Sequence, residues 1–296
     1  MANNLANYIR EIWSPEVQRL ATKSLVAMDI VDMVSMPDGD TYHKPYQSDP
    51  AVGSYTRNAT SSAVSATDIT TTDEYLTVDT AKYASFFVDR LDEKQMMYNL
   101  QGKLKTRSAY KLRDTIDAAI LAEYANAASY VQADDVSGTA GQPVTLTTSN
   151  VFDVLEAFKS KLALQDVEDS GDFFLIVDPV NYYKVLERAM ASAGFKNADQ
   201  TIQNGFMGKI LDINIYMSRN LTQATVGGTN AYHWLGGKKG AISFAMQANS
   251  ELEVKDLPQN TDGTIRLGTQ YIIWNLYGKK TFTDGTRELV DVRIKV

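Results

Sequence analysis

The amino-acid sequence predicts an α+β fold with one long helix and two regions that form sheets. Three observations support this class. Residues 91–128 keep a helical spacing of apolar positions without a proline, residues 148–261 alternate between helical and strand patterns, and residues 262–296 are strand-like.

The composition limits the classes of function. The chain has 296 residues, of which 44% are hydrophobic and 22% are charged, enough for one large domain or two modest ones. It has no cysteine, which excludes disulfides, thiolate metal sites and a cysteine nucleophile and suits a reducing cytoplasm. Its net charge is -7 with scattered lysine and arginine, so we expect no basic stripe and no tight nucleic-acid binding. No apolar run of about eighteen residues occurs, which disfavours membrane insertion.

The first segment predicts an N-terminal arm with a broken amphipathic helix. Apolar residues recur at helical spacing between residues 5 and 26, and Ser14 followed by Pro15 is typical of a helix start. The first thirty residues lack the continuous apolar segment of a signal peptide, so we expect no export by that route.

Residues 36–74 predict a long extended loop, punctuated by prolines and almost free of aliphatic side chains, as in GDTYHKPYQSDPAVGSY (residues 39–55). Ordering each residue costs roughly 1–2 kcal/mol of backbone entropy, which such a loop cannot recover by burial in its own molecule. Tyrosine is favoured at interfaces, so Tyr42, Tyr46 and Tyr55 indicate a loop that lies on another protein surface. A mobile loop with incidental tyrosines is the alternative.

Residues 75–147 are expected to contain a strand followed by the longest helix. Aromatic and β-branched side chains favour a strand up to Val88. Apolar positions from Met97 to Ile120 then keep helical register and predict one helix of about thirty-five residues. At about 1.5 Å per residue it would exceed 50 Å, so it must serve as a spine, with Gly102 as a local weak point.

Residues 148–261 predict an α/β unit. FFLIV at residues 173–177 is a short buried strand, and Asp178 with Pro179 is expected to cap the helix that follows. Two alternating segments, joined by the turn-forming GGKKG, complete the unit.

The C-terminal residues 262–296 are interpreted as three strands. An Asp284-Gly285 pair separates the last two, and this pair is typical of a tight hairpin turn. The chain would therefore end in a sheet.

No motif with catalytic or metal-binding spacing is found. His43 and His233 are far apart in sequence and are interpreted as structural or surface residues. The acidic segment DVEDSGD (residues 166–172) is similar to a calcium loop, but Val177 stands where an EF-hand needs its bidentate glutamate. We interpret that segment as a solvated connection between a helix and a strand.

The order of several segments resembles the major capsid proteins of tailed bacteriophages with the HK97 fold. The matching segments are WSPEVQRLATKSLVAMDIV in the arm, TVDTAKYASFFVDRLDEKQ leading to LRDTIDAAILAEY, and the phrases GFMGKILDINIYMSRNL and KKGAISFAMQ. The resemblance covers nearly the whole chain and depends on the order and spacing of these segments together.

This resemblance implies four parts of the chain. They are an N-terminal arm (residues 1–35), an extended E-loop (residues 36–74), a peripheral domain with the spine helix (residues 75–147 and 262–296, the helix at about 91–128) and an α/β axial domain (residues 148–261). The E-loop would lie over the neighbouring subunit, and axial loops would meet around the fivefold and quasi-sixfold axes.

The resemblance also implies where subunits touch. In the E-loop the expected contacts are Tyr42, His43, Lys44, Tyr46, Tyr55 and Arg57. At the axes the expected contacts lie in residues 194–205, namely Phe195, Lys196, Asn197 and Gln203, or in residues 222–230. Some members join subunits by a Lys-Asn isopeptide bond, but Lys44 is the only lysine of the loop and neither acceptor nor catalytic Glu can be matched, so we expect a non-covalent shell.

The implied function is self-assembly into an icosahedral head that encloses double-stranded DNA without sequence-specific binding. The implied partners are further copies of the chain as pentamers and hexamers, a portal protein, a separate scaffolding protein and decoration proteins, with no cofactor, catalysis or membrane. The implied location is the virion, after assembly in the host bacterial cytoplasm. Two alternatives stay open: an encapsulin-type bacterial nanocompartment shell, and an α/β enzyme that uses residues 148–261.

Overall fold

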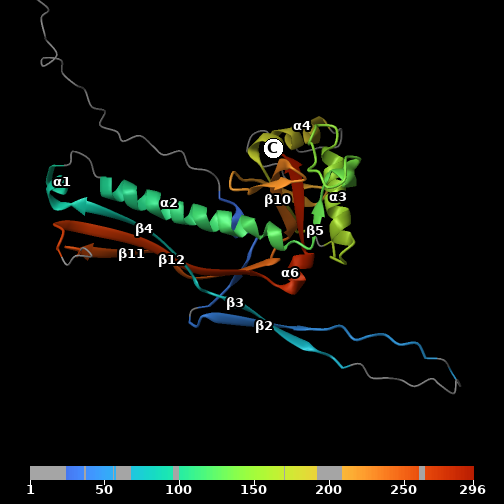
Figure 1. Ribbon diagram of the computed structural model, residues 1–296, viewed down its shortest axis with the longest axis horizontal. Coiled ribbons are helices and arrows are strands. Elements are labelled where there is room, and N and C mark those ends of the chain that lie inside the picture. Colours follow the sequence, from blue (N-terminus) through green and yellow to red (C-terminus); the bar gives the residue numbers. More distant parts are fainter. Residues whose placement is uncertain are drawn as a thin grey trace, which may run out of the picture.

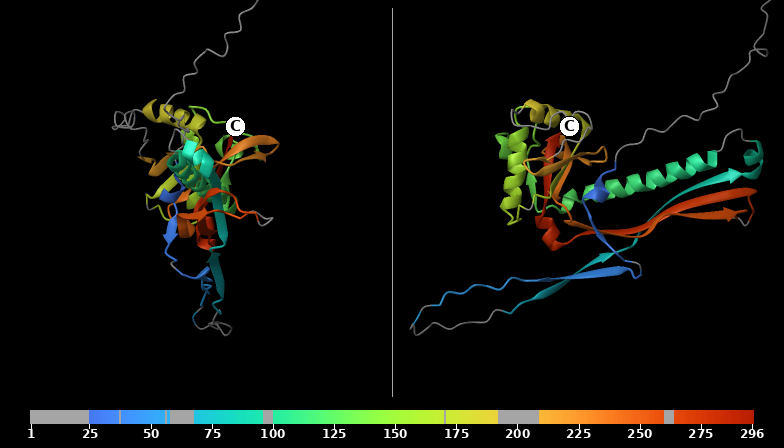
Figure 2. Two further views of the ribbon diagram at one scale, coloured as in Figure 1. Left: turned by 90° about the vertical axis from the view of Figure 1, so that its left-hand side faces the viewer. Right: turned by 180° about the vertical axis from the view of Figure 1, so that it is seen from behind.

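The computed structural model describes residues 25–36, 38–55, 57, 68–95, 100–169, 171–191, 209–259 and 264–296. These residues form an α/β unit, a long sheet with one helix along it, and a hairpin that projects from the sheet (Figure 1). Figure 2 shows the same arrangement from the side and from behind. Most of the predicted N-terminal arm, up to residue 24, lies outside the described residues.

A seven-stranded sheet is the centre of the α/β unit. Its strands follow the order β5 (Ser129–Val131), β13 (Leu289–Lys295), β10 (Thr229–Lys238), β6 (Phe173–Val177), β8 (Ile213–Met217) and β7 (Lys209–Ile210), with β9 (Gln223–Val226) paired to β10. Helix α3 (Val151–Ala163) packs against β5 and β13, and α4 (Pro179–Ala191) lies next to α3 (Figure 1). All five residues of β6 are buried, which confirms the predicted core strand FFLIV.

Asp178 begins helix α4 in the predicted way. Its carboxylate accepts the backbone N–H groups of Val180 and Asn181, each at 3.1 Å, which satisfies two donors of the first helical turn. The same carboxylate accepts the indole N–H of Trp234 at 2.9 Å, so the helix cap is also tied to strand β10.

A four-stranded sheet forms the long part of the subunit. Its strands follow the order β1 (Asp32–Val34), β11 (Ile242–Asp256), β12 (Gly268–Thr281) and β4 (Thr80–Asp89). Helix α2 (Leu100–Leu121) runs along one face of this sheet (Figure 1) and buries Leu112, Ile116 and Ile120. At about 1.5 Å per residue, α2 is about 33 Å long.

The predicted spine helix is shorter than the sequence indicates. It is α-helical in α1 (Arg90–Gln95) and in α2, but residues 122–126 form a 3₁₀ turn, and the prediction is wrong for residues 122–128. The physical reason is the anchoring of Glu123 within this turn, because its carboxylate accepts hydrogen bonds from Lys279 at 2.6 Å and Thr281 at 2.8 Å on strand β12. Residues 96–99 lie outside the described residues.

The sequence predicts three strands in residues 262–296, but the structure has two, β12 and β13. Strand β12 continues for 14 residues in the four-stranded sheet, whereas β13 belongs to the seven-stranded sheet. The predicted hairpin turn at Asp284-Gly285 is wrong, because these residues lie in the short helix α6 (Thr283–Arg287), which carries the chain from one sheet to the other. Strand β11, from within residues 148–261, likewise lies in the four-stranded sheet.

The predicted E-loop begins and ends as a β-ribbon. Strands β2 (Thr41–Gln47) and β3 (Thr71–Thr77) pair antiparallel, so this part is extended as expected but is hydrogen-bonded strand and not loop. The strand predicted from residue 75 to 88 is divided into β3 and β4. The hairpin points away from both sheets (Figure 2).

Candidate assembly surfaces

The β2–β3 hairpin has little support from its own subunit. Its ladder runs from Thr41 opposite Thr77 to Gln47 opposite Thr71, and the Ser48 N–H extends it by a 3.0 Å bond to the Thr70 carbonyl. Most side chains of both strands are exposed. Because an isolated two-stranded hairpin is marginally stable in water, a second molecule could add most of the burial that this hairpin lacks.

The base of the hairpin is fixed to the subunit body. The backbone N–H of Thr283 donates to Glu74 Oε2 at 2.9 Å, and the Thr283 hydroxyl donates to Glu74 Oε1. These hydrogen bonds lower the pKa of Glu74 below its ordinary value. Leu76 is fully buried in a small cluster with Phe282, and the Lys44 ammonium lies 5.2 Å from the centre of the Phe282 ring. The hairpin therefore leaves the body at a defined angle.

The alternation of the strands divides the predicted contact residues between two faces. Tyr42, Lys44 and Tyr46 share the face of Glu74 and Leu76, which at the base of the hairpin contacts the subunit body. Tyr46, farther along the hairpin, is half-buried, whereas Tyr42 and Lys44 are exposed.

His43 lies on the opposite, free face of the hairpin. Its Nδ1 is 2.8 Å from Asp73 Oδ2, and its ring lies 5.8 Å from that of Tyr75, which is exposed. Sequence reasoning missed Tyr75 as a contact candidate, although the period of two along β3 could have placed it beside His43. Towards the tip, Tyr55 is 67% exposed and Arg57 is exposed.

The four-stranded sheet exposes apolar side chains on the face away from α2. In β12 the alternate residues Tyr271, Ile273 and Tyr277 are buried, whereas Ile272 and Trp274 are partly exposed. Tyr83 of β4 stands opposite Trp274 in the register and is 74% exposed. We call Tyr83, Ile272 and Trp274 the open sheet face. The neighbouring apolar side chains make this face a candidate surface for contact with another protein.

The expected axial contacts are only partly described. Phe195, Lys196, Asn197 and Gln203 lie outside the described residues. The alternative segment, residues 222–230, is largely the β9–β10 hairpin, whose turn glycines have φ angles of 55° and 81°, typical of a tight two-residue turn.

The turn of the β9–β10 hairpin is tied to its own subunit. The side-chain amide of Gln142 donates to the Gly227 carbonyl at 2.9 Å, and its carbonyl oxygen accepts from the Thr229 hydroxyl at 3.3 Å. The turn is therefore held in one orientation, at one end of strand β10.

His233 has the structural role predicted for it. The side chain is buried, and its Nδ1 lies 2.9 Å from both carboxylate oxygens of Asp291. The imidazole stacks on Tyr124 with a centroid distance of 4.2 Å, and Arg293 Nε donates to Asp291 at 2.8 Å. These contacts join the 3₁₀ turn after α2 to the seven-stranded sheet.

The acidic segment 166–172 connects α3 with β6, as predicted. Asp169 forms a 2.9 Å ion pair with Lys159 of α3, which lowers the pKa of Asp169. Across the part of the chain that the structure describes, no three metal-ligating side chains come together. None of the described helices is both long and apolar enough to cross a membrane.

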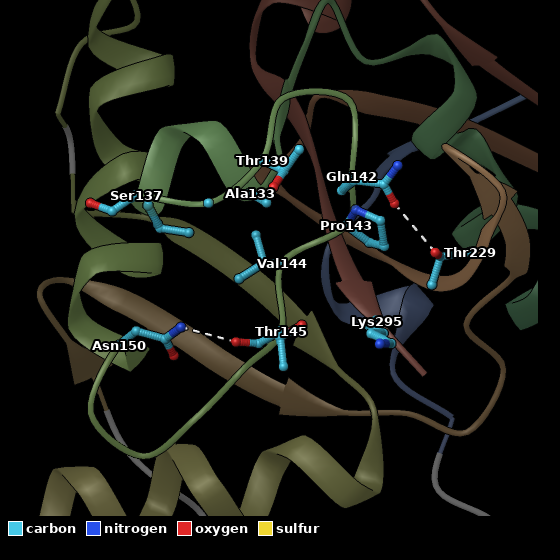
Figure 3. Close-up of a pocket in the computed structure, with 12 residues that line it drawn as sticks. Ala133, Ser137, Thr139, Gln142, Pro143, Val144, Thr145, Asn150, Thr229 and Lys295 are labelled. Atoms are coloured by element: carbon cyan, nitrogen blue, oxygen red, sulfur yellow. Dashed lines mark hydrogen bonds between the residues drawn. The ribbon is translucent and has the colours of Figure 1, made fainter.

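A polar groove of about 430 Å³ lies in the α/β unit (Figure 3). The side chains of Thr139, Gln142, Asn150 and Thr229 line it, and Lys295 is the charged residue of the described lining. The lining contains neither a carboxylate nor an imidazole, so it has no pair suited to general acid–base catalysis. The groove gives no support to the enzyme alternative.

Comparison with solved structures agrees with this architecture over nearly the whole chain. The chain is similar to a protein of Mycobacterium phage Che8, with a TM-score of 0.75, 19% identity and 98% of each chain covered. A capsid structure of cyanophage P-SCSP1u gives a TM-score of 0.70 at 14% identity, covering 99% of this chain and 95% of that one. The mature capsid of bacteriophage PhiM1 gives 0.67 at 15% identity, covering 97% and 92%.

A match to a known protein family shows which family the chain belongs to. No curated protein matches the chain. The family described as phage capsid protein, however, matches residues 72–278, which include α2, both sheets in large part and the open sheet face. A structural shell role agrees with the groove that lacks acid–base residues and with the hairpin that lacks internal support. The chain therefore belongs to the phage capsid protein family and is a structural protein, not an enzyme.

Proposed function

We propose that neighbouring copies of this chain are joined by the β2–β3 hairpin of one copy lying on the open sheet face of the next. The chain is the major capsid protein of a tailed bacteriophage, and copies of it form an icosahedral shell. The observation that carries the proposal is a hairpin fixed at its base by Glu74 and Thr283 and exposed over the rest of its length.

The two surfaces are chemically suited to each other. The free face of the hairpin presents His43 and Tyr75, and its tip presents Tyr55 and Arg57, while the open sheet face presents aromatic and aliphatic side chains. Tyrosine and arginine combine apolar area with hydrogen-bonding groups, which suits them to interfaces. Around closed symmetry, many such contacts give a stable shell even if each is weak.

We infer that the two sheets correspond to the two domains of the capsid fold. The four-stranded sheet with α2 would be the peripheral domain, and the seven-stranded sheet with α3 and α4 would be the axial domain. This division follows the hydrogen-bonded sheets, so β11 moves to the peripheral domain and β13 to the axial domain relative to the division along the chain.

The remaining contacts stay part of the proposal. Tyr42, Lys44 and Tyr46 would meet the neighbour only where the hairpin has left the body. Phe195, Lys196, Asn197 and Gln203, or the β9–β10 turn, would approach the symmetry axes. Portal, scaffolding and decoration proteins would be the other partners, and double-stranded DNA the content of the shell.

The experiment is to replace residues 48–70 by Asn-Gly, which suits a two-residue hairpin turn, so that β2, β3 and the Glu74 anchor are kept. We expect the variant to melt like the wild-type chain but to form no shells, tubes or capsomers in negative-stain microscopy and sedimentation. A variant that unfolds, or one that still assembles normally, would contradict the proposal.

A pair of double substitutions refines the test. Tyr55→Ser with Tyr75→Ser should reduce assembly, because both side chains lie on the exposed hairpin. Tyr130→Ser with Tyr183→Ser removes two exposed tyrosines from the α/β unit and is the matched control. Equal loss of assembly in both variants would show that the hairpin has no special role.

A further inference from the structure

A small apolar groove lies at the root of the hairpin, on one edge of the four-stranded sheet. It has a volume of about 340 Å³ and lies where the pairing of β1 with residues 243–245 of β11 ends. Its lining contains three methionines and no charged residue, and consists of Met33, Val34, Ser35, Met36, Met246 and Gln247. We call this cavity the methionine groove.

The lining of the methionine groove suits an apolar or aromatic side chain from outside. Met33 is 52% exposed, whereas Met36 is buried in the small cluster with Leu76 and Phe282. Methionine side chains are unbranched and flexible, and their sulfur atoms make favourable contacts with aromatic rings. The groove therefore adapts to the shape of an incoming apolar side chain, and its lining offers no counter-ion to a charged one.

The outer part of the hairpin carries side chains of matching chemistry. Beyond the β2–β3 ladder, Val52 is 99% exposed, Tyr55 is 67% exposed and Ile69 is 59% exposed. We call these three residues the outer hairpin group. Three apolar side chains on one projecting segment indicate a surface that a second molecule covers, because burial removes them from water.

The outer hairpin group does not reach the methionine groove of its own subunit. The side-chain amide of Gln247 donates to the Gly39 carbonyl oxygen, so the groove lies beside the residue two positions before β2. From there the seven residues of β2 extend for about 23 Å, and the hairpin points away from both sheets (Figure 2). A hairpin that fills the groove must therefore come from another copy of the chain.

A hairpin that crosses a neighbour's open sheet face is long enough to end at that neighbour's methionine groove. The open sheet face includes Tyr83 on the edge strand β4, and the groove lies at the opposite edge of the same sheet, beside β1. Four strands with a spacing of about 4.8 Å span about 15 Å. An extended chain from Thr41 to Tyr55 spans up to about 46 Å, well beyond that width.

We propose that the methionine groove of each subunit receives the outer hairpin group of a neighbouring copy, with Tyr55 as the side chain that enters it. This inference rests on the proposed function, because it extends the contact on the open sheet face to the outer end of the hairpin. The outer end of each hairpin then lies at the root of the next one. Since the two surfaces differ, the contact is heterologous and repeats around a ring.

The absence of cysteine from the chain permits a direct test by disulfide cross-linking. Two cysteines form a bridge only when their Cα atoms lie within about 7 Å of each other. The test variant is Tyr55→Cys with Met33→Cys in the full-length chain. The matched control is Tyr55→Cys with Val254→Cys, because Val254 is 51% exposed but lies opposite Tyr271 on the face of the sheet that α2 covers. Assembled particles are oxidised and analysed on non-reducing gels, together with each single cysteine variant.

We expect the test variant to give a ladder of linked subunits, whereas the control and the single variants stay monomeric on the gel. Particles of the test variant without a ladder, or an equally strong ladder in the control, would overturn the proposal. Because particles form in both of these cases, the groove inference would fail and the shell function would stand.

Oxidation of methionine in the wild-type chain covers the case in which the test variant does not assemble. The free chain and assembled particles are treated with dilute peroxide, and the sulfoxide of Met33 is measured by mass spectrometry. We expect Met33 to oxidise several-fold more slowly in particles, because Tyr55 of a neighbour covers it. Equal oxidation in both states would overturn the proposal, and a wild-type chain that forms no particles would contradict the shell function on which it rests.

Discussion

At the scale of single residues, two buried carboxylates near the end of α2 hold distant segments together. Asp117 Oδ1 accepts the backbone N–H groups of Val26 and Ala27 at 2.8 and 2.9 Å, and Oδ2 accepts from Asn220 at 2.7 Å. Glu123 binds Lys279 and Thr281 of strand β12. The spine helix is therefore joined to the arm, to a loop of the α/β unit and to the long sheet by charged hydrogen bonds.

Glu123 makes the stability of the fold dependent on pH. Burial would raise the pKa of this carboxyl, but hydrogen bonds from Lys279, Thr281 and Asn126 together with the Lys279 charge lower it below the ordinary value of 4.5. Because the folded-state pKa is the lower one, this stabilisation is complete above about pH 4.5 and is lost as the pH falls through the folded-state pKa.

Glu123→Gln should therefore destabilise the subunit at pH 7 by about 1–3 kcal/mol, since a hydrogen-bonded charge is lost from a buried site. The difference from the wild-type chain should shrink as the pH falls below 4.5. Melting temperatures from pH 7 down to acid measure both effects, and the exposed Glu187→Gln is the control. A constant difference at every pH would mean that the carboxylate charge does not contribute.

At the scale of elements, the chain crosses twice between the sheets, and the two crossings touch. Residues 239–241 connect β10 with β11, and α6 with its flanking residues connects β12 with β13. Gly285 of α6 packs so closely on the Ala241 carbonyl oxygen that a Cβ atom there would overlap it. A glycine is needed at this position for close approach of two backbones, not for an unusual turn.

Gly285→Ala should destabilise the subunit by about 1–3 kcal/mol, because one of the two crossings must move. Gly102→Ala is the matched change in a helix, where a Cβ atom meets nothing within 4 Å. It should stabilise the subunit by about 1 kcal/mol through helix propensity alone. Urea unfolding of both variants measures whether each substitution lowers or raises the free energy of unfolding. A Gly285→Ala variant as stable as the wild-type chain would refute the close contact.

The elements that the sequence predicts well are those with a buried face. The spacing of Leu112, Ile116 and Ile120 predicts a helix, and the apolar run FFLIV predicts a buried strand. Both predictions succeed because the side chains that are buried in the structure recur in the sequence with the period of the element that they belong to. The β2–β3 hairpin has few buried side chains and so resembles a polar loop in sequence. The end of α2 is determined by Lys279 and Thr281, which are more than 150 residues away from Glu123.

At the scale of the whole molecule, the subunit presents two different surfaces for contact. A hairpin extends beyond the body (Figure 1), and the open sheet face exposes Tyr83 and part of Trp274. Tyr83 and most of the hairpin are left uncovered by the described residues of their own chain, and the proposed contact between neighbouring copies would cover them.

The proposed contact surfaces are predictable from the sequence only in part. The polar, tyrosine-bearing stretch indicated an intermolecular role for residues 39–55 without a structure. The division of its side chains between an anchored face and a free face depends on pairing with β3 and on the bonds between Glu74 and Thr283, which are 209 residues apart. The open sheet face combines β4 with β12, so it emerges only when the two strands are aligned.

Hydrogen exchange, measured on the unassembled chain and on assembled particles, tests the central claim most directly. If a neighbour covers the hairpin, backbone amides of residues 41–57 and 68–77 should exchange rapidly in the free chain and become protected on assembly, while those of the buried strand β6 stay protected in both states. Equal exchange of the hairpin amides in both states would contradict the account, because the hairpin would then be no part of the joint between subunits.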